Sequence, residues 1–216
     1  MEYLVNNNFF YSSIFTVTSE QILSAVIDTN KTLLRNPENL YKTLDLKTIS
    51  SIVGAIFCDR LTNSIDGAIV NPIEKGHPDI VPVNAINATE SELRNYPHGL
   101  EIKTTVGNVK TGSALKAGDN RLHFITGITW QAHHREVHEL MGLIWDFNAI
   151  SNNFLFPMIT GVFFSSDLTN DDWGAISGTT GRNTKVCGMT AKGRHKMKNG
   201  WVVIHKDYNQ KYNKLL

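Results

Sequence analysis

The sequence predicts a single α/β domain in which a mixed central β-sheet is flanked by helices. Apolar residues recur at helical spacing in the first 64 residues, whereas strand-like runs follow Asp66-Gly67. No linker, repeat or low-complexity tract divides the 216 residues, a length that suits one large domain with a substantial core. We divide this domain into a mainly helical part at 1–64, a sheet at 65–170 and a basic part at 171–216.

Two helices are predicted in the first part. Thr18 and Gln21 have the spacing of a capping box, and the apolar residues after them indicate a helix over about 19–34. A second helix, over about 46–61, has one apolar face with i, i+3, i+4 and i+7 spacing. We expect this face to be fully buried against the sheet; it consists of Ile49, Ile52, Val53 and Ile56.

Strand signals dominate the second part. Apolar and polar positions alternate only partially there, so we expect most strands to be buried on both faces. A polar loop containing three glycines is expected from Thr104 to Arg121. The predicted strands are 68–70, 79–83, 100–105, 122–130, 140–147 and 154–164.

Two of these strands carry the residues with the clearest chemical meaning. Because side chains alternate along a strand, Glu101 and Lys103 should project from one face while Leu100 and Ile102 point into the core. If the strand that begins at Asp79 pairs in the same sheet, its carboxylate can reach Glu101. Two carboxylates with room for water suit Mg²⁺, which keeps part of its hydration shell.

Such a group has the components for hydrolysing a phosphodiester. A bound Mg²⁺ ion would polarise a phosphoryl oxygen and lower the pKa of a coordinated water. Lys103 would orient or help deprotonate that water, and would offset the charge that develops on the phosphate. The sequence therefore favours a metal-dependent nuclease.

The segments Pro78-Asp79 and Glu101-Ile102-Lys103 resemble the motif of the PD-(D/E)XK nuclease superfamily, and their surroundings resemble type II restriction endonucleases. The resemblance spans roughly residues 50–205. The surrounding segments that share it are Asn71-Pro72, Leu143-Ile144-Trp145-Asp146-Phe147, Gly181-Arg182-Asn183-Thr184, Met189-Thr190-Ala191 and Gly200-Trp201-Val202.

The resemblance implies a restriction endonuclease-like fold and Mg²⁺-dependent cleavage of both strands of a short, palindromic double-stranded DNA site, leaving 5′-phosphate and 3′-OH ends. It implies that Asp79, Glu101 and Lys103 are catalytic, and that Asp79, Glu101 and Ile102 bind the metal. A homodimer is expected, because a two-fold symmetric protein matches a palindromic site and supplies one active site per strand.

Two segments are expected to contact the DNA. The first is the basic part. The segment from Gly174 to Leu216 contains nine basic residues and one acidic residue, a net charge of +8, whereas the first 173 residues carry a net charge of −7. Such a patch supplies the counterion release that dominates DNA affinity, although a solvated lysine-rich end remains an alternative. The second segment is the loop after the Glu-x-Lys strand, whose alternative is a plain surface hairpin. The candidate DNA-binding residues are Thr104, Asn108, Lys110, Ser113, Lys116, Arg121, Arg182, Asn183, Lys185, Lys192 and Arg194.

Other metal sites are disfavoured. The only cysteines, Cys58 and Cys187, are too few for a disulfide framework or a zinc cluster and fit a reducing cytoplasm. His134 and His138 have the spacing of a helical metal pair, but Arg135 stands where a zinc protease has its glutamate. No signal peptide or membrane-spanning run is seen, so we expect a soluble protein.

Two alternatives to a restriction enzyme remain open. One is another nuclease of the same superfamily, such as a repair or junction-resolving enzyme, which would need branched or mismatched DNA. The other is a DNA-binding module without catalytic activity, for which the basic part would suffice. The recognition sequence and the overhang cannot be deduced from sequence, because base readout depends on side-chain placement and on DNA deformability.

Overall fold

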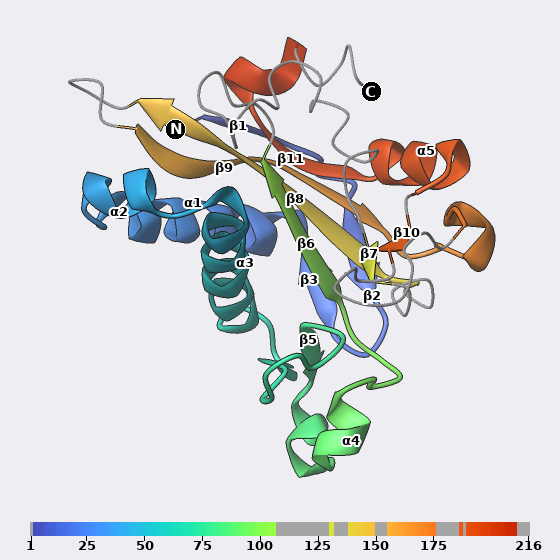
Figure 1. Cartoon of the computed structure of the whole chain (residues 1–216). Helices are drawn as coiled ribbons and strands as arrows, with labels where there is room; N and C mark the ends of the chain where they lie inside the picture. The colour runs from blue at the N-terminus through green and yellow to red at the C-terminus, as the bar shows by residue number, and fades with distance from the viewer. Residues whose placement is uncertain are drawn as a thin grey trace.

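The computed structural model describes residues 2–106, 130–131, 138–149, 155–175, 186–187 and 189–210. They form an α/β arrangement around a five-stranded mixed sheet with the strand order β1-β11-β9-β8-β6 (Figure 1). Only the β6–β8 pair is parallel. The strands of this sheet are β1 (Tyr3–Val5), β6 (Glu101–Val106), β8 (Leu140–Ala149), β9 (Leu155–Ser165) and β11 (Trp201–His205).

Three two-stranded ladders accompany the main sheet, and the largest helices pack on it. The ladders pair β2 (Phe10–Ser12) with β3 (Thr16–Thr18), β4 (Ala68–Val70) with β5 (Ile80–Pro82), and β7 (Trp130–Gln131) with β10 (Val186–Cys187). The α-helices are α1 (Ser19–Leu34), α2 (Glu38–Thr43), α3 (Leu46–Thr62), α4 (Glu90–Leu93) and α5 (Ala191–Asn199). Short 3₁₀ turns lie at Val83–Asn87, Asn170–Asp172 and Lys206–Tyr208.

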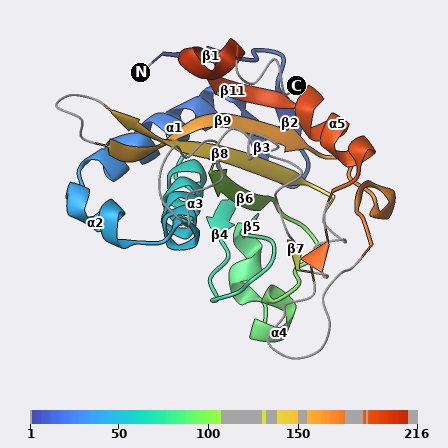
Figure 2. The same ribbon diagram turned by 45° about the horizontal axis from the view of Figure 1, so that its top comes forward.

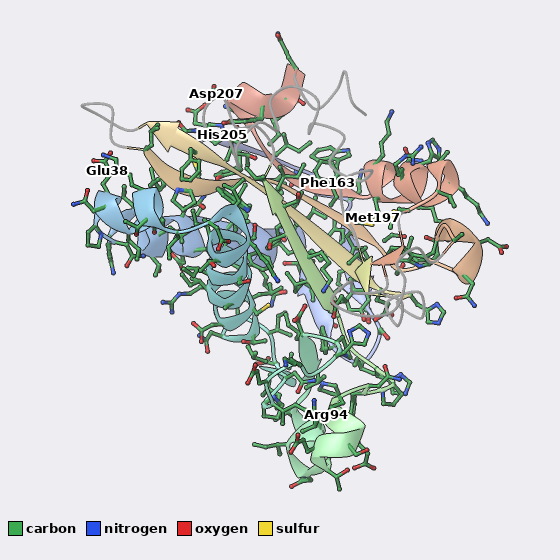
Figure 3. All side chains as sticks on the ribbon, in the orientation of Figure 1. Glu38, Arg94, Phe163, Met197, His205 and Asp207 are labelled. Carbon is green, nitrogen blue, oxygen red and sulfur yellow. The ribbon has the colours of Figure 1, made fainter. Side chains whose placement is uncertain are left out.

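Both faces of the sheet are buried, as the sequence predicted. Met141 and Trp145 of β8 join the core beneath α1 and α3, whereas Leu140 and Ile144 of the same strand join a second core beneath α5. Figure 3 shows Phe163 of β9 and Met197 of α5, which meet in that second core. β8 and β9 are mostly apolar, because most of their described side chains are buried on one face of the sheet or the other.

A capping residue stabilises the first turn of each of the two long helices, α1 and α3. Thr18 and Gln21 form the predicted capping box of α1. Asp45 caps α3 by accepting a hydrogen bond from the Thr48 amide, 2.8 Å away. α3 then lies beside β6 and β8: the Thr104 hydroxyl of β6 donates to the Ser50 carbonyl (2.9 Å), and Trp145 Nε1 of β8 donates to the Ser50 hydroxyl (2.9 Å). These contacts fix α3 against the strand that carries Glu101.

The buried face of α3 differs from the predicted one. Ile49 and Val53 are fully buried as expected, but Ile52 and Ile56 are only half-buried at the margin of the core. Phe57 and Leu61 continue the buried stripe of Ile49 and Val53 with i, i+4, i+8 and i+12 spacing, so the helix is turned slightly from the predicted orientation. The expectation of an enclosed Ile52 was therefore wrong.

Other boundaries also change. Thr104–Val106 belongs to β6 and not to the loop predicted from Thr104, and the rest of that loop lies outside the described residues. Of the strand predicted over 122–130, only Trp130 is described, in β7. The sheet also takes β1 and β11 from beyond the predicted range 65–170. In the described part of the chain, no helix is long and apolar enough to cross a membrane.

Phe57→Ala is expected to lower the free energy of unfolding by about 3–5 kcal/mol, because it removes a fully buried aromatic ring from the main core. Ile52→Ala, on the same helix, should cost clearly less, since Ile52 is only half-buried. Urea unfolding of both variants provides the comparison. Equal losses would contradict the orientation of α3.

Candidate active site

The candidate site forms where β5 meets the start of β6. Ile80 and Leu100 form an antiparallel bridge, with Ile80 N donating to the Leu100 carbonyl (3.1 Å) and Leu100 N donating to the Ile80 carbonyl (2.9 Å). In an antiparallel pair, the residue before one partner faces the residue after the other, so Asp79 lies opposite Glu101. The bridge thus brings together two carboxylates that are 22 positions apart in the sequence.

Gly99 makes this close approach possible. Its φ of +154° lies in a region that residues with a side chain rarely adopt. A Cβ atom added at Gly99 would lie 2.3 Å from the Ile80 carbonyl oxygen and 2.4 Å from Pro78 Cγ. Only glycine therefore fits where the chain turns into β6 alongside β5.

Glu101 is 2% exposed and has a partner on each carboxylate oxygen. His77 Nδ1 donates to Oε2 at 2.8 Å, and Lys103 Nζ pairs with Oε1 at 2.5 Å. Glu101 and Lys103 thus share a face of β6, as strand alternation predicted. Although burial raises the pKa of the Glu101 carboxyl, His77 and Lys103 outweigh it and bring this pKa to about 2, so Glu101 is ionised at neutral pH.

The pKa of Asp79 is shifted in the opposite direction from that of Glu101. Its Oδ2 accepts a hydrogen bond from the Ile102 amide at 2.8 Å. Burial, and then the negative charge of Glu101, raise the pKa of Asp79 to about 7. Burial lowers the pKa of Lys103, but the charges of Glu101 and Asp79 more than offset this and raise it above its usual value, which keeps the lysine protonated. When Asp79 is ionised as well, the two carboxylates carry one more negative charge than Lys103 neutralises.

These residues fit a magnesium ion better than a zinc ion. Because the N–H and C=O of a strand residue point toward the same edge, the Ile102 carbonyl lies on the side of Asp79, to which its N–H donates. The possible donors are then two carboxylates and one carbonyl, all hard oxygens. Within the described residues, no group of three or more His, Cys, Asp and Glu side chains is arranged to hold a metal. Water and phosphate oxygens would have to complete the coordination, as is usual for Mg²⁺.

The turn before Asp79 is fixed by Asn71. The Asn71 side-chain amide donates to the carbonyls of Pro78 (3.1 Å) and Leu93 (3.0 Å), and its backbone N–H donates to the Asp79 carbonyl (2.8 Å). A Cβ atom at Gly76 would lie 2.2 Å from the Asn71 side chain. Asn71 therefore sets the path of the His-Pro-Asp segment.

The sequence did not predict the contacts of His77 and Asn71 in this site. The position of His77 beside Asp79 indicated that it lies near the predicted metal, with a turn-stabilising role as the default interpretation, and Asn71-Pro72 was noted only as part of the resemblance. The sequence did contain an indication of both roles, because a polar residue next to a predicted metal ligand often orients that ligand. The hydrogen-bond partners of His77 and Asn71, however, depend on the folded structure of the turn.

Two cavities lie on either side of the carboxylate pair. The first, of about 550 Å³, is bordered by α3, the turn after β4 and the start of β6, and Asp79 and Lys103 both line it. The second, of about 520 Å³, is lined by His77 and Glu101. Figures 1 and 2 show α3 beside β6 in both views, with the β4–β5 ladder and α4 projecting away from the main sheet.

The predicted DNA-binding residues are only partly described. The hydroxyl of Thr104 is engaged with Ser50 of α3. On α5, Lys192 is exposed, whereas the Arg194 guanidinium donates to the Met189 carbonyl at 3.0 Å. The remaining candidates lie outside the described residues; they are Asn108, Lys110, Ser113, Lys116, Arg121, Arg182, Asn183 and Lys185.

No family model matches this chain, and neither the curated proteins nor the solved structures contain a match. A functional assignment therefore depends on the geometry of the chain's own residues.

Proposed function

We propose that this chain is a Mg²⁺-dependent, site-specific DNA endonuclease of the type II restriction class, with a restriction endonuclease-like fold. The observation that carries the proposal is the placement of Asp79 opposite Glu101, with Lys103 on the Glu101 carboxylate and the Ile102 carbonyl on the same edge. The charge excess at this site favours a divalent cation, and its oxygen donors favour Mg²⁺.

In the proposed reaction, water attacks the phosphorus atom and the bond to the 3′ oxygen breaks, which leaves a 5′-phosphate and a 3′-OH. Bound Mg²⁺ would polarise the phosphate and acidify the attacking water. Asp79, Glu101 and the Ile102 carbonyl would hold the ion, and the protonated Lys103 would orient the water and stabilise the charge that develops on the phosphate. A homodimer would supply one such site to each strand of a palindromic duplex.

The proposal is tested by incubating the purified chain with Mg²⁺ and three substrates: a linear plasmid, a branched duplex and a mismatched duplex. Discrete fragments from the plasmid are expected. Cutting confined to the branched or mismatched duplex would indicate a repair or junction-resolving nuclease. DNA binding without any cutting in Mg²⁺ or Mn²⁺ would indicate a DNA-binding module and contradict the proposal.

His77 is expected to position the metal ligand Glu101. It holds Oε2 from a nearly buried position, and partners of this kind are typically worth about 10–100-fold in metal affinity or activity. His77→Ala should therefore raise the Mg²⁺ concentration needed for half-maximal cutting by about that factor, and His77→Asn, which retains a donor, should recover part of it.

The control for His77 is DNA binding in Ca²⁺ without Mg²⁺, which both variants should retain. A Mg²⁺ dependence of cutting equal to that of the unsubstituted protein would show that the contact between His77 and Glu101 has no role in metal binding.

A further inference from the structure

The two cavities beside the carboxylate pair differ in charge. Two lysines besides Lys103 line the cavity next to α3, and among the described residues its only acidic side chain is Asp79. The cavity on the other side is lined by Glu101 and Glu139, and its described lining contains no lysine or arginine. A negatively charged polymer such as DNA would therefore meet positive side chains in one cavity and negative side chains in the other.

The two additional lysines are Lys47 and Lys75. Lys47 is exposed in the first turn of α3, and Lys75 is exposed in the turn between β4 and β5. In the described part of the chain neither lysine forms an ion pair, although the charge of Lys47 helps to lower the pKa of the exposed Asp45 two residues away. Such lysines keep their charge available for a ligand, unlike Lys196, which is paired with Asp167 and Asp172.

The cavity lining also includes neutral polar residues. Ser50 and Ser51 belong to the same helix as Lys47 and line the same cavity; the Ser50 hydroxyl accepts from Trp145 Nε1 (2.9 Å), and the Ser51 hydroxyl donates to the Lys47 carbonyl (3.1 Å). Lys103 and Asp79 lie on its inner side. A strand placed here would meet the reacting groups and the lysines together, whereas on the other side it would meet two glutamates.

Building on the proposed function, we propose that the DNA strand being cut lies in the cavity between α3 and the β4–β5 turn, where Lys47 and Lys75 contact phosphates that flank the cut. These contacts are independent of base sequence, because lysine binds the phosphate as a point charge. They form a DNA-binding surface separate from the basic C-terminal part.

The test measures duplex binding in Ca²⁺, without cutting, at several salt concentrations. The variants are Lys47→Gln, Lys75→Gln and the double variant, which remove the positive charge but keep a polar side chain. Lys31→Gln is the matched control, since Lys31 is an exposed helical lysine on α1 paired only with Asp28 in the described structure. Circular dichroism verifies that each variant is folded.

Each single variant should lower the slope of log K against log salt by about 0.9, and the double variant by about twice that amount. The losses should be equal on cognate and unrelated DNA. If the unsubstituted protein cuts DNA but the double variant keeps the slope of the Lys31→Gln control, this path is wrong and the nuclease assignment stands. If the unsubstituted protein binds no DNA, both the proposed path of the strand and the nuclease assignment are wrong.

Discussion

Glu101→Gln and Asp79→Asn are each expected to lower the rate of Mg²⁺-dependent DNA cleavage by about 10³-fold or more. Each substitution replaces a charged ligand by a neutral amide of the same shape, so the metal loses a carboxylate while the backbone keeps its path. Lys103→Met should lose activity to a similar extent, because it removes the cation that we propose stabilises the developing charge. Single-turnover cleavage gives these rates, and DNA binding in Ca²⁺ should survive in all three variants.

Asp59→Asn is the matched control. Asp59 is an acidic residue near the end of α3 whose side chain is 57% exposed and pairs with Arg60 at 3.3 Å. This variant should cut at the rate of the unsubstituted protein. Near-normal cleavage by the Asp79 or Glu101 variant would show that the carboxylate pair is not needed for cutting and would contradict the proposed nuclease site.

The second large effect is on stability in the absence of metal. Asp79 has a folded-state pKa of about 7, above the value of about 3.8 expected for an unfolded chain. The folded protein therefore holds a proton that the unfolded chain has lost, and stability falls as the pH rises from about 4 through 7. Between pH 5 and pH 8 this group should lower the free energy of unfolding by about 3 kcal/mol.

Glu101 and Lys103 do not titrate in this range. The depressed pKa of Glu101 contributes stability that is lost only as the pH falls from about 4.5 through 2, and the raised pKa of Lys103 contributes stability that is lost only above its ordinary range. His205 acts in the opposite direction, because burial lowers its pKa. Its contribution cancels when the unsubstituted protein is compared with Asp79→Asn.

Denaturant unfolding at pH 5 and pH 8, with and without Mg²⁺, measures the effect. Without metal, the unsubstituted protein should lose stability on going to pH 8 relative to Asp79→Asn. Added Mg²⁺ should restore stability at pH 8 to the unsubstituted protein alone, because a ligand that binds only the folded state stabilises it. Parallel pH profiles for the two proteins would show that Asp79 is an ordinary carboxylate.

The sequence predicted the elements whose signals are local. The helices over 19–34 and 46–61 were confirmed as α1 and α3, because capping residues and apolar spacing lie within each segment. The short strand β1 was missed, since its three residues carry no periodicity and its partner β11 lies near the other end of the chain. α5 was missed because its only buried residues are Gly193 and Met197, which gives no apolar face.

In the candidate site, too, the local arrangement was predicted and the contacts between distant segments were not. Strand alternation was enough to place Glu101 and Lys103 together. The position of Asp79 opposite Glu101 depends on the Ile80–Leu100 bridge, a tertiary contact that the motif suggests but the spacing does not determine. The contact of His77 with Glu101 depends further on the turn that Asn71 holds. Such contacts follow from the path of the chain and not from any local pattern.

The most direct test of the nuclease assignment is to digest a long DNA of known sequence with the purified chain and Mg²⁺, and to sequence the ends of the fragments. Breaks in both strands are expected at one short, palindromic sequence, with 5′-phosphate and 3′-OH ends. These breaks should disappear in EDTA and with Glu101→Gln prepared in the same way. No cutting in Mg²⁺ or Mn²⁺, or the same fragments from the Glu101→Gln preparation, would contradict it.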